Sequence, residues 1–255
     1  MKIFRKSVLF FLLVFLLGIS FYWMPFILIR FKKLDFTHTV LYTIATKNTC
    51  SANSEEEKVL QLYTYVCKKI KKPNYKQNYD TTILGFNGQH LYSGLGFCDE
   101  QCNTLLALAN TIDIQGRLLF LFGNDSISHH SVCEIKIANH YGMFDPFYKI
   151  ILKNSKGQIA STQEIIDLPR LLDKIEIPFG ISDSDYRHLF GKKYPFKIVK
   201  YNRIVQLPDE KKIHAIYTSW YAIFGEAGRK RLFDYYYSRN QIQQKDQKRI
   251  EKLFL

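Results

Sequence analysis

Acidic residues are scarce in this chain. Only 23 Asp and Glu stand against 36 Lys and Arg among 255 residues, which gives a formal net charge of +13. Such an excess predicts an anionic neighbour, either nucleic acid or a membrane surface. No recognised nucleic-acid-binding motif accompanies the charge, which disfavours nucleic acid as a partner. The membrane surface is the preferred interpretation.

Cysteine is scarce as well. Five thiols, an odd number, are too few for a disulfide scaffold, so we expect some of them to be free. Two of them, Cys98 and Cys102, lie in the stretch GFCDEQC. A disulfide between these two is disfavoured, because positions i and i+4 of a helix sit near the upper limit of bridging distance.

Charge is absent from residues 7–29. At about 1.5 Å per residue this run spans roughly 34 Å, enough for a bilayer core of about 30 Å. Tyr22 and Trp23 lie near one end, where aromatic rings favour the membrane interface. We expect a single-pass anchor over residues 1–33. The alternative is a cleaved signal peptide cut after Ser20, disfavoured because the apolar run continues past it.

Basic residues flank both ends of this run and nearly balance, so they leave its orientation weakly determined. They are Lys2, Arg5 and Lys6 before it, and Arg30, Lys32 and Lys33 after it. A short N-terminal flank with an exported domain is the usual outcome. We therefore expect a membrane protein with an extracytoplasmic domain.

Three further regions follow the anchor. Residues 34–53 are turn-rich and predict a linker or a first strand, residues 54–200 a folded domain, and residues 201–255 a basic helical extension. Ser54 opens a capped helix that ends before Pro73. Residues 74–97, rich in Asn, Gly and Tyr, predict a long loop.

A second helix is expected to begin near Cys98. Its first turn places the thiol beside unpaired backbone N–H groups and the positive end of the helix dipole, which lowers a thiol pKa from about 8.5. Asp99 and Glu100 oppose this effect. A thiolate at Cys98 therefore needs a cationic partner, for which histidine is the natural candidate.

Three strands are predicted next, over residues 117–123, 130–138 and 141–149. Cys98, His130 and Asp145 could converge as nucleophile, base and orienting carboxylate. A tight turn at Asn139-His140 would place Asp145 opposite Glu134, away from His130. A longer loop or a bulge would have to shift that register.

Other roles for these residues remain open. Cys98 is alternatively a buried structural thiol or, with Cys102, His130 and Cys133, part of a zinc site. Cys133 points to the opposite strand face from His130, which disfavours the metal. His129 would take the role of His130 after a one-residue shift. Arg117 is expected to be structural, and no cofactor or metal is expected.

Four motifs in order resemble the bacterial transglutaminase-like superfamily, over about residues 55–170. They are GFC ending at Cys98, IQGR ending at Arg117, HSVCEI beginning at His130, and FDP around Asp145. The tail after Asp145 also resembles that family, with a strand, a Gly turn and a Ser/Thr-capped helix. Val132 replaces the family's tryptophan, and Asp113 replaces a glycine that a left-handed helix end requires.

The resemblance implies a papain-like α+β fold, with a cysteine-bearing helix packed on an antiparallel sheet. It implies Cys98 as nucleophile, His130 as general base and acid, and Asp145 as the orienter of His130. Besides the Cys98 backbone N–H, Gln89 and Tyr92 are candidate oxyanion donors. The expected function is a cysteine-dependent acyl hydrolase or acyl transferase acting on a peptide, amide or ester at the cell envelope. The alternative is a catalytically inactive binding or assembly module.

The last 66 residues are strongly basic. Residues 190–255 carry 15 Lys and Arg against 6 Asp and Glu. Apolar residues at helical spacing predict a helix there, preceded by Asp209 and Glu210: Ile213, Ile216, Tyr217, Trp220 and Phe224. This helix is expected either to pack on the domain with a solvated basic face or to rest on anionic lipid.

Overall fold

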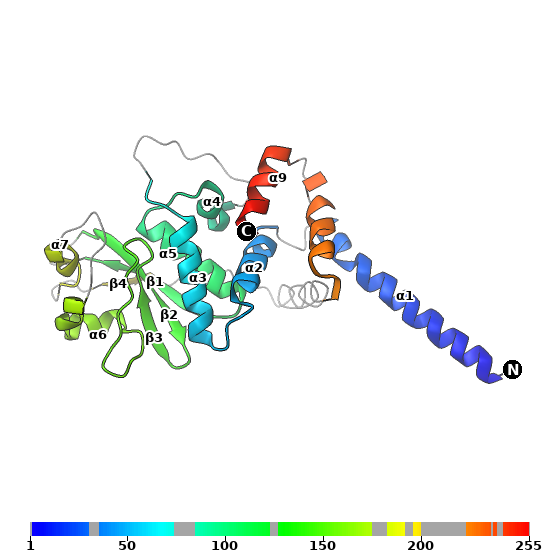
Figure 1. Ribbon diagram of the computed structural model, residues 1–255, viewed down its shortest axis with the longest axis horizontal. Coiled ribbons are helices and arrows are strands. Elements are labelled where there is room, and N and C mark those ends of the chain that lie inside the picture. Colours follow the sequence, from blue (N-terminus) through cyan, green and yellow to red (C-terminus); the bar gives the residue numbers. More distant parts are fainter. Residues whose placement is uncertain are drawn as a thin grey trace. The chain divides into compact units, whose positions relative to one another are not determined.

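The computed structural model describes residues 2–30, 36–73, 85–122, 127–174, 183–191, 196–199, 223–235, 237–238 and 242–254 (Figure 1). The chain forms two compact units, each described below by itself. One comprises residues 1–39 and 203–251, and the other residues 40–202 and 252–255. The helix predicted over residues 213–224 lies outside the described residues, apart from its last two positions.

The first unit is built on α1 (Lys2–Arg30), an apolar helix. Its segment Phe10–Ile27 has a mean hydropathy of 2.2 and is largely exposed, so α1 is long and apolar enough to cross a membrane. A signal sequence meets the same criteria, so the uncleaved anchor stays a prediction.

A second helix of this unit, residues 223–235, contacts the aromatic end of α1. Phe26 packs edge-on against Tyr235 with ring centroids 5.2 Å apart. Arg231 donates a hydrogen bond from Nη1 to the Tyr22 hydroxyl at 2.9 Å. α9 (Gln244–Glu251) follows in the chain.

Residues 36–49, expected within a linker, form the helix α2 (Phe36–Thr49) instead. The reason is tertiary: four apolar side chains of α2 are at most 1% exposed, namely Val40, Leu41, Ile44 and Ala45. Burying them stabilises a helix whose Thr-rich sequence gives little intrinsic propensity.

The capped helix predicted after Ser54 is α3 (Glu55–Lys69). The Glu57 N–H donates to Ser54 Oγ at 3.1 Å, and three glutamates occupy the first turn. The prediction of a long loop over 74–97 is wrong for residues 85–93, which form the helix α4 (Gly85–Ser93); residues 74–84 lie outside the described part. His90, Leu91 and Tyr92 of α4 are buried, and this packing outweighs two glycines.

A four-stranded antiparallel sheet forms the centre of the second unit, in the order β3-β2-β1-β4. Its strands are β1 (Gly116–Leu121), β2 (His130–Ile137), β3 (His140–Phe144) and β4 (Lys197–Val199). The cysteine-bearing helix α5 (Cys98–Thr111) packs on the sheet, as predicted. The fold is a mixed helix and antiparallel-sheet structure of the α+β class.

Helices cover both faces of this sheet (Figure 1). On one face α5 lies between the sheet and α3, and its Cys102 thiol donates to the Ser131 carbonyl at 3.6 Å. The other face carries α6 (Thr162–Asp167), the 3-10 helix η1 (Pro169–Lys174) and α7 (Asp183–His188). Their apolar core includes Val132, Met143, Ile165 and Tyr186.

The register of β2 and β3 differs from the predicted one. The two-residue turn lies at residues 138–139, one position earlier than expected, with Ala138 at φ 51°. Cys133 therefore pairs with Phe144, and the next residue, Asp145, falls two positions closer to His130 than a turn at Asn139-His140 would allow. No bulge interrupts this ladder.

Candidate active site

Cys98 is the first residue of α5, as the sequence predicts. The entering chain is held by Glu100, whose Oε2 accepts a hydrogen bond from the Phe97 N–H at 2.7 Å. The chain packs closely at Gly96, where a Cβ would lie 3.1 Å from Ile70 Cγ2. The Cys98 thiol remains partly exposed.

His130 begins β2 and is only 3% exposed. Its Nε2 lies 2.7 Å from Asp145 Oδ2. Its ring also interacts with the Cys98 side chain, because each group shifts the pKa of the other; since Asp145 occupies Nε2, the ring nitrogen that remains for the thiol is Nδ1. His130 thus interacts with both Asp145 and Cys98.

Asp145 is fully buried and follows the last residue of β3. Its backbone pairs with that of Ile150, which closes a four-residue loop over residues 146–149. Its Oδ1 accepts the Tyr148 N–H at 3.0 Å, and its Oδ2 accepts the Tyr186 hydroxyl at 3.0 Å as well as His130. Three donors therefore fix the carboxylate.

The electrostatics of the pair favour an ionised thiol. Burial by itself raises the pKa of Cys98, but a hydrogen bond from His130, its charge and a backbone hydrogen bond from Ser131 together hold that pKa below its ordinary value. Burial by itself lowers the pKa of His130, but the Asp145 carboxylate and Cys98 raise it to about 9. The lowered pKa of Cys98 and the raised pKa of His130 together favour a thiolate–imidazolium pair.

Aromatic rings surround the histidine. The Tyr148 ring centroid lies 4.8 Å from that of His130, Phe147 6.0 Å and Tyr186 6.3 Å. Sequence reasoning missed Tyr148 and Tyr186. Tyr148 stands three residues after Asp145 and could have been noticed, but nothing in the sequence links Tyr186 to a residue 41 positions earlier.

The two predicted oxyanion donors lie on α4. Gln89 Nε2 is 2.9 Å from His90 Nε2, so its amide is engaged within that helix. Tyr92 is buried. The oxyanion role of Gln89 and Tyr92 stays a prediction, as does that of the Cys98 backbone N–H.

Two other thiols, those of Cys102 and Cys133, lie in the core of the second unit. Cys102 and Cys133 are fully buried, and the Cys133 thiol donates to the Phe144 carbonyl at 3.6 Å. All five cysteines are free. Within the described part of the chain, no group of three or more His, Cys, Asp and Glu side chains is arranged to hold a metal ion.

Arg117 and Glu134, within two of the motifs, are bonded to each other. Arg117 Nη2 lies 2.6 Å from Glu134 Oε2, and Glu134 Oε1 accepts the Thr162 N–H at 2.8 Å. Asp113 adopts φ 64°, which confirms the left-handed conformation expected of it. These motif residues shape the domain around the site.

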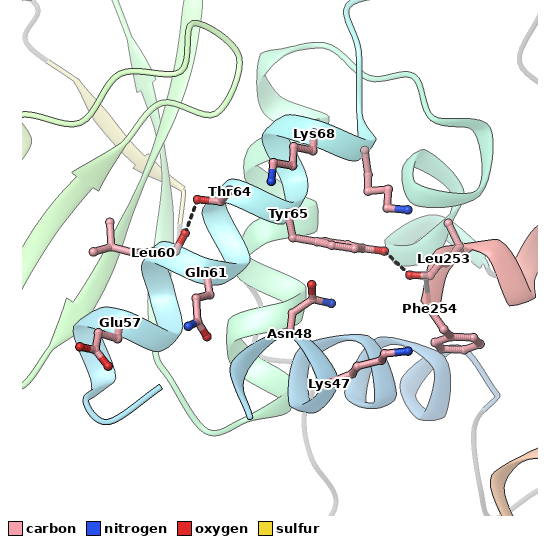
Figure 2. A pocket seen from close by; sticks show the side chains of 11 residues that line it. Lys47, Asn48, Glu57, Leu60, Gln61, Thr64, Tyr65, Lys68, Leu253 and Phe254 are labelled. Carbon is pink, nitrogen blue, oxygen red and sulfur yellow. Dashed lines mark hydrogen bonds between the residues drawn. The ribbon is translucent and has the colours of Figure 1, made fainter. Parts of the chain in front are cut away.

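A pocket of about 560 Å³ lies elsewhere in the same unit, where α3 meets α2 and the C-terminal 3-10 helix η2 (Lys252–Phe254) (Figure 2). Tyr65 donates its hydroxyl to the Leu253 carbonyl at 2.8 Å across it. None of Cys98, His130 and Asp145 lines this pocket. Its lysines belong to the last turns of two helices, where positive charge complements the helix dipole: Lys47, Lys68 and Lys69.

Comparison with known proteins adds little. No protein-family model matches the chain, and no curated protein matches it. A solved structure from Cytophaga hutchinsonii, described as a candidate cysteine protease, is similar over 44% of this chain and 38% of its own, with 17% sequence identity and a TM-score of 0.36. A likeness this distant carries no argument about activity.

Proposed function

We propose that this chain is a membrane-anchored cysteine acyl hydrolase or acyl transferase of the transglutaminase-like type, with Cys98, His130 and Asp145 as its triad. The observation that carries the proposal is the 2.7 Å hydrogen bond between the buried His130 ring and the Asp145 carboxylate, next to a partly exposed Cys98 whose pKa His130 lowers. A nucleophile, a base and a group that orients the base are the parts that covalent acyl transfer needs.

In the first half-reaction the Cys98 thiolate attacks the carbonyl carbon of an amide or ester, and the carbonyl oxygen becomes an oxyanion. The proton on His130 Nδ1 passes to the leaving amine or alcohol as its bond to the carbonyl carbon breaks, which leaves a thioester on Cys98. In the second half-reaction His130 takes a proton from water or an amine, which attacks the thioester. The C–S bond then breaks and the thiolate returns.

The oxyanion needs hydrogen-bond donors at the position where its charge develops. The Cys98 backbone N–H is the nearest candidate, because it opens α5. We retain Gln89 and Tyr92 of α4 as the second donor, since α4 packs against α5. Substrate is proposed to be a peptide, amide or ester of the cell envelope.

The membrane part of the proposal rests on α1 and the helix that contacts it. Residues 223–235 include three consecutive basic residues, Arg229, Lys230 and Arg231, of which Arg231 bonds to Tyr22 of α1 and Arg229 pairs with Glu226. Basic residues beside an aromatic helix end are suited to anionic lipid headgroups. The domain is proposed to lie outside the cytoplasm.

The test is to trap the thioester. The full chain in detergent is mixed with a p-nitrophenyl ester, and acylation is located by peptide mass spectrometry. We expect acylation of Cys98 with a burst of nitrophenol, lost in Cys98→Ala and at least about 100-fold slower in His130→Ala. Adding a primary amine separates transfer from hydrolysis, because transfer yields an amide of that amine.

The matched control is Cys50→Ser, since Cys50 is an exposed thiol outside the site. This variant should keep the burst and the acylation of Cys98. Equal acylation of Cys50 and Cys98, indifferent to His130, would contradict the enzyme and favour the catalytically inactive binding module.

A further inference from the structure

The buried carboxylate of Asp145 is shared between two donors at the same oxygen. Oδ2 accepts His130 Nε2–H at 2.7 Å and the Tyr186 hydroxyl at 3.0 Å, while Oδ1 accepts the Tyr148 N–H at 3.0 Å. Rotating the carboxylate would break hydrogen bonds at both oxygens. Because Asp145 and His130 are buried, each broken bond would leave a polar group unsatisfied at considerable cost.

Tyr186 is held firmly enough to act as a fixed point. Its side chain is fully buried, and its ring packs against Phe190 with centroids 5.5 Å apart. The next residue, Arg187, donates to Asp173 Oδ1 at 2.7 Å and to the Leu172 carbonyl at 3.1 Å, which ties α7 to η1. A buried phenol requires an acceptor, and Asp145 supplies it.

We infer that Tyr186 is a positioning residue of the proposed triad: its hydroxyl fixes the Asp145 carboxylate in the orientation that holds the His130 ring toward Cys98. This inference rests on the proposed function and adds Tyr186 to the three residues of the proposed triad. Tyr186 does not touch the reacting atoms. It acts through Asp145, which acts through His130.

The consequence for Cys98 follows from charge. A fixed carboxylate keeps the imidazolium stable, and the imidazolium keeps the thiolate stable. Without the Tyr186 hydroxyl, the Asp145 carboxylate keeps two of its three donors and is held less firmly. His130 then loses part of its support, and the thiol binds its proton more tightly. The other titratable groups that act on this set are Asp99 and Cys102 on α5, Tyr148 in the loop after β3, Tyr63 on α3 and Asp185 on α7.

The test compares two tyrosines that bond to the same residue. Tyr186→Phe removes the hydroxyl bonded to the Asp145 carboxylate. Tyr63→Phe is the matched control, because the Tyr63 hydroxyl donates to the Asp145 backbone carbonyl at 3.3 Å and is also buried. Alkylation of Cys98 by iodoacetamide is followed from pH 5 to pH 10 in the full chain, with the Cys98 peptide quantified separately.

We expect Tyr186→Phe to slow alkylation about threefold to tenfold at pH 6 and to leave the rate unchanged at pH 9.5, since a tenfold change corresponds to one unit of thiol pKa. Tyr63→Phe should keep the wild-type profile. If Tyr186→Phe keeps it too, Tyr186 has no positioning role. A uniform loss of rate at every pH would also overturn the inference, because it indicates general disruption.

A milder variant covers the case in which Tyr186→Phe does not fold. Asp173→Asn weakens the exposed pair that ties α7 to η1, and it should shift the profile in the same direction by a smaller factor. No shift in Asp173→Asn would then overturn the inference. Failure of the proposed function looks different: wild-type Cys98 would alkylate like an ordinary thiol, with no dependence on His130.

Discussion

At the residue scale, the site depends on how a buried carboxylate is accommodated. Asp145 has no exposed surface, and such a charge is tolerated only when its oxygens are hydrogen-bonded or paired. Three donors meet this need, and one of them is His130. The same charge sets the pKa of His130 at about 9 against the opposing effect of burial.

Asp145→Asn tests this charge. The pKa of His130 should fall from about 9, because the negative charge of Asp145 that raises it is removed. The pKa of Cys98 should rise, because its cationic partner is lost. The thiolate–imidazolium pair exists above the pKa of Cys98 and below that of His130, so its pH range narrows from both sides. Alkylation of Cys98 at pH 6 should fall roughly tenfold or more.

The measurement is the rate of Cys98 alkylation against pH, with a thermal melt to show that the variant is folded. An amide also places a donor where the carboxylate accepted one, so a lower melting temperature is expected. A variant with the wild-type pH profile would mean that Asp145 does not control His130.

At the element scale, Glu134 connects three segments. From β2 its carboxylate accepts hydrogen bonds from Arg117 on β1, at 2.7 Å from Nε, and from the first N–H of α6. It therefore fixes the start of α6, which Ser161 also caps. Gly116 shows how closely this region packs, because a Cβ there would lie 2.9 Å from the Glu134 carbonyl oxygen.

Glu134→Ala should lower the free energy of unfolding by about 2 kcal/mol, because it leaves the Thr162 N–H and the Arg117 guanidinium without their acceptor. The loss is limited by the partial exposure of Arg117, whose side chain is 30% accessible. Denaturant unfolding of the full chain in detergent measures it. Lys136→Ala, on the same strand and partly exposed, should change stability by less than about 0.5 kcal/mol.

At the scale of the whole molecule, α1 is long and apolar enough to cross a membrane, a criterion that a signal sequence also meets. The apolar window of α1 is largely exposed, which separates it from the core helices of a soluble domain. In the second unit, the last described residues return to α3, where Leu253 and Phe254 are buried. Residues 252–254 are thus packed within that unit.

Labelling of Cys50 tests on which side of the membrane the second unit lies. It is exposed in the second unit, and with Cys98→Ala as background the other thiols are buried. A membrane-impermeant maleimide should label Cys50 in intact cells as fully as in permeabilised ones. Cys50→Ser should abolish the label. Labelling only after permeabilisation would place the domain in the cytoplasm.

Local signals made several elements predictable. Ser54 and its glutamates specify α3, Asp113 ends α5 in a left-handed conformation, and Ser161 caps α6. Helix caps and turns depend on residues within a few positions, so they can be read directly from the chain. The same holds for Cys98 at the start of α5, and hence for one member of the candidate site.

Contacts between distant segments could not be predicted from residues that are neighbours in the sequence. α2 and α4 are helical because buried apolar side chains outweigh weak propensities, and no local pattern states what will cover them. The hairpin turn fell one residue from the predicted place, which was enough to move Asp145 two positions along β2. Tyr186 could not be found at all, because only the folded chain brings α7 to Asp145.

The sequence by itself determined the apolar N-terminal helix, the basic charge, the cysteine at a helix start and the candidates His130 and Asp145. Each of these follows from composition or from neighbours along the chain. The tertiary structure decided which nitrogen of His130 meets Asp145, how many donors hold that carboxylate, and that the pKa of the Cys98 thiol is lowered. These depend on strand register and side-chain packing across the sheet, where a shift of one residue changes every partner.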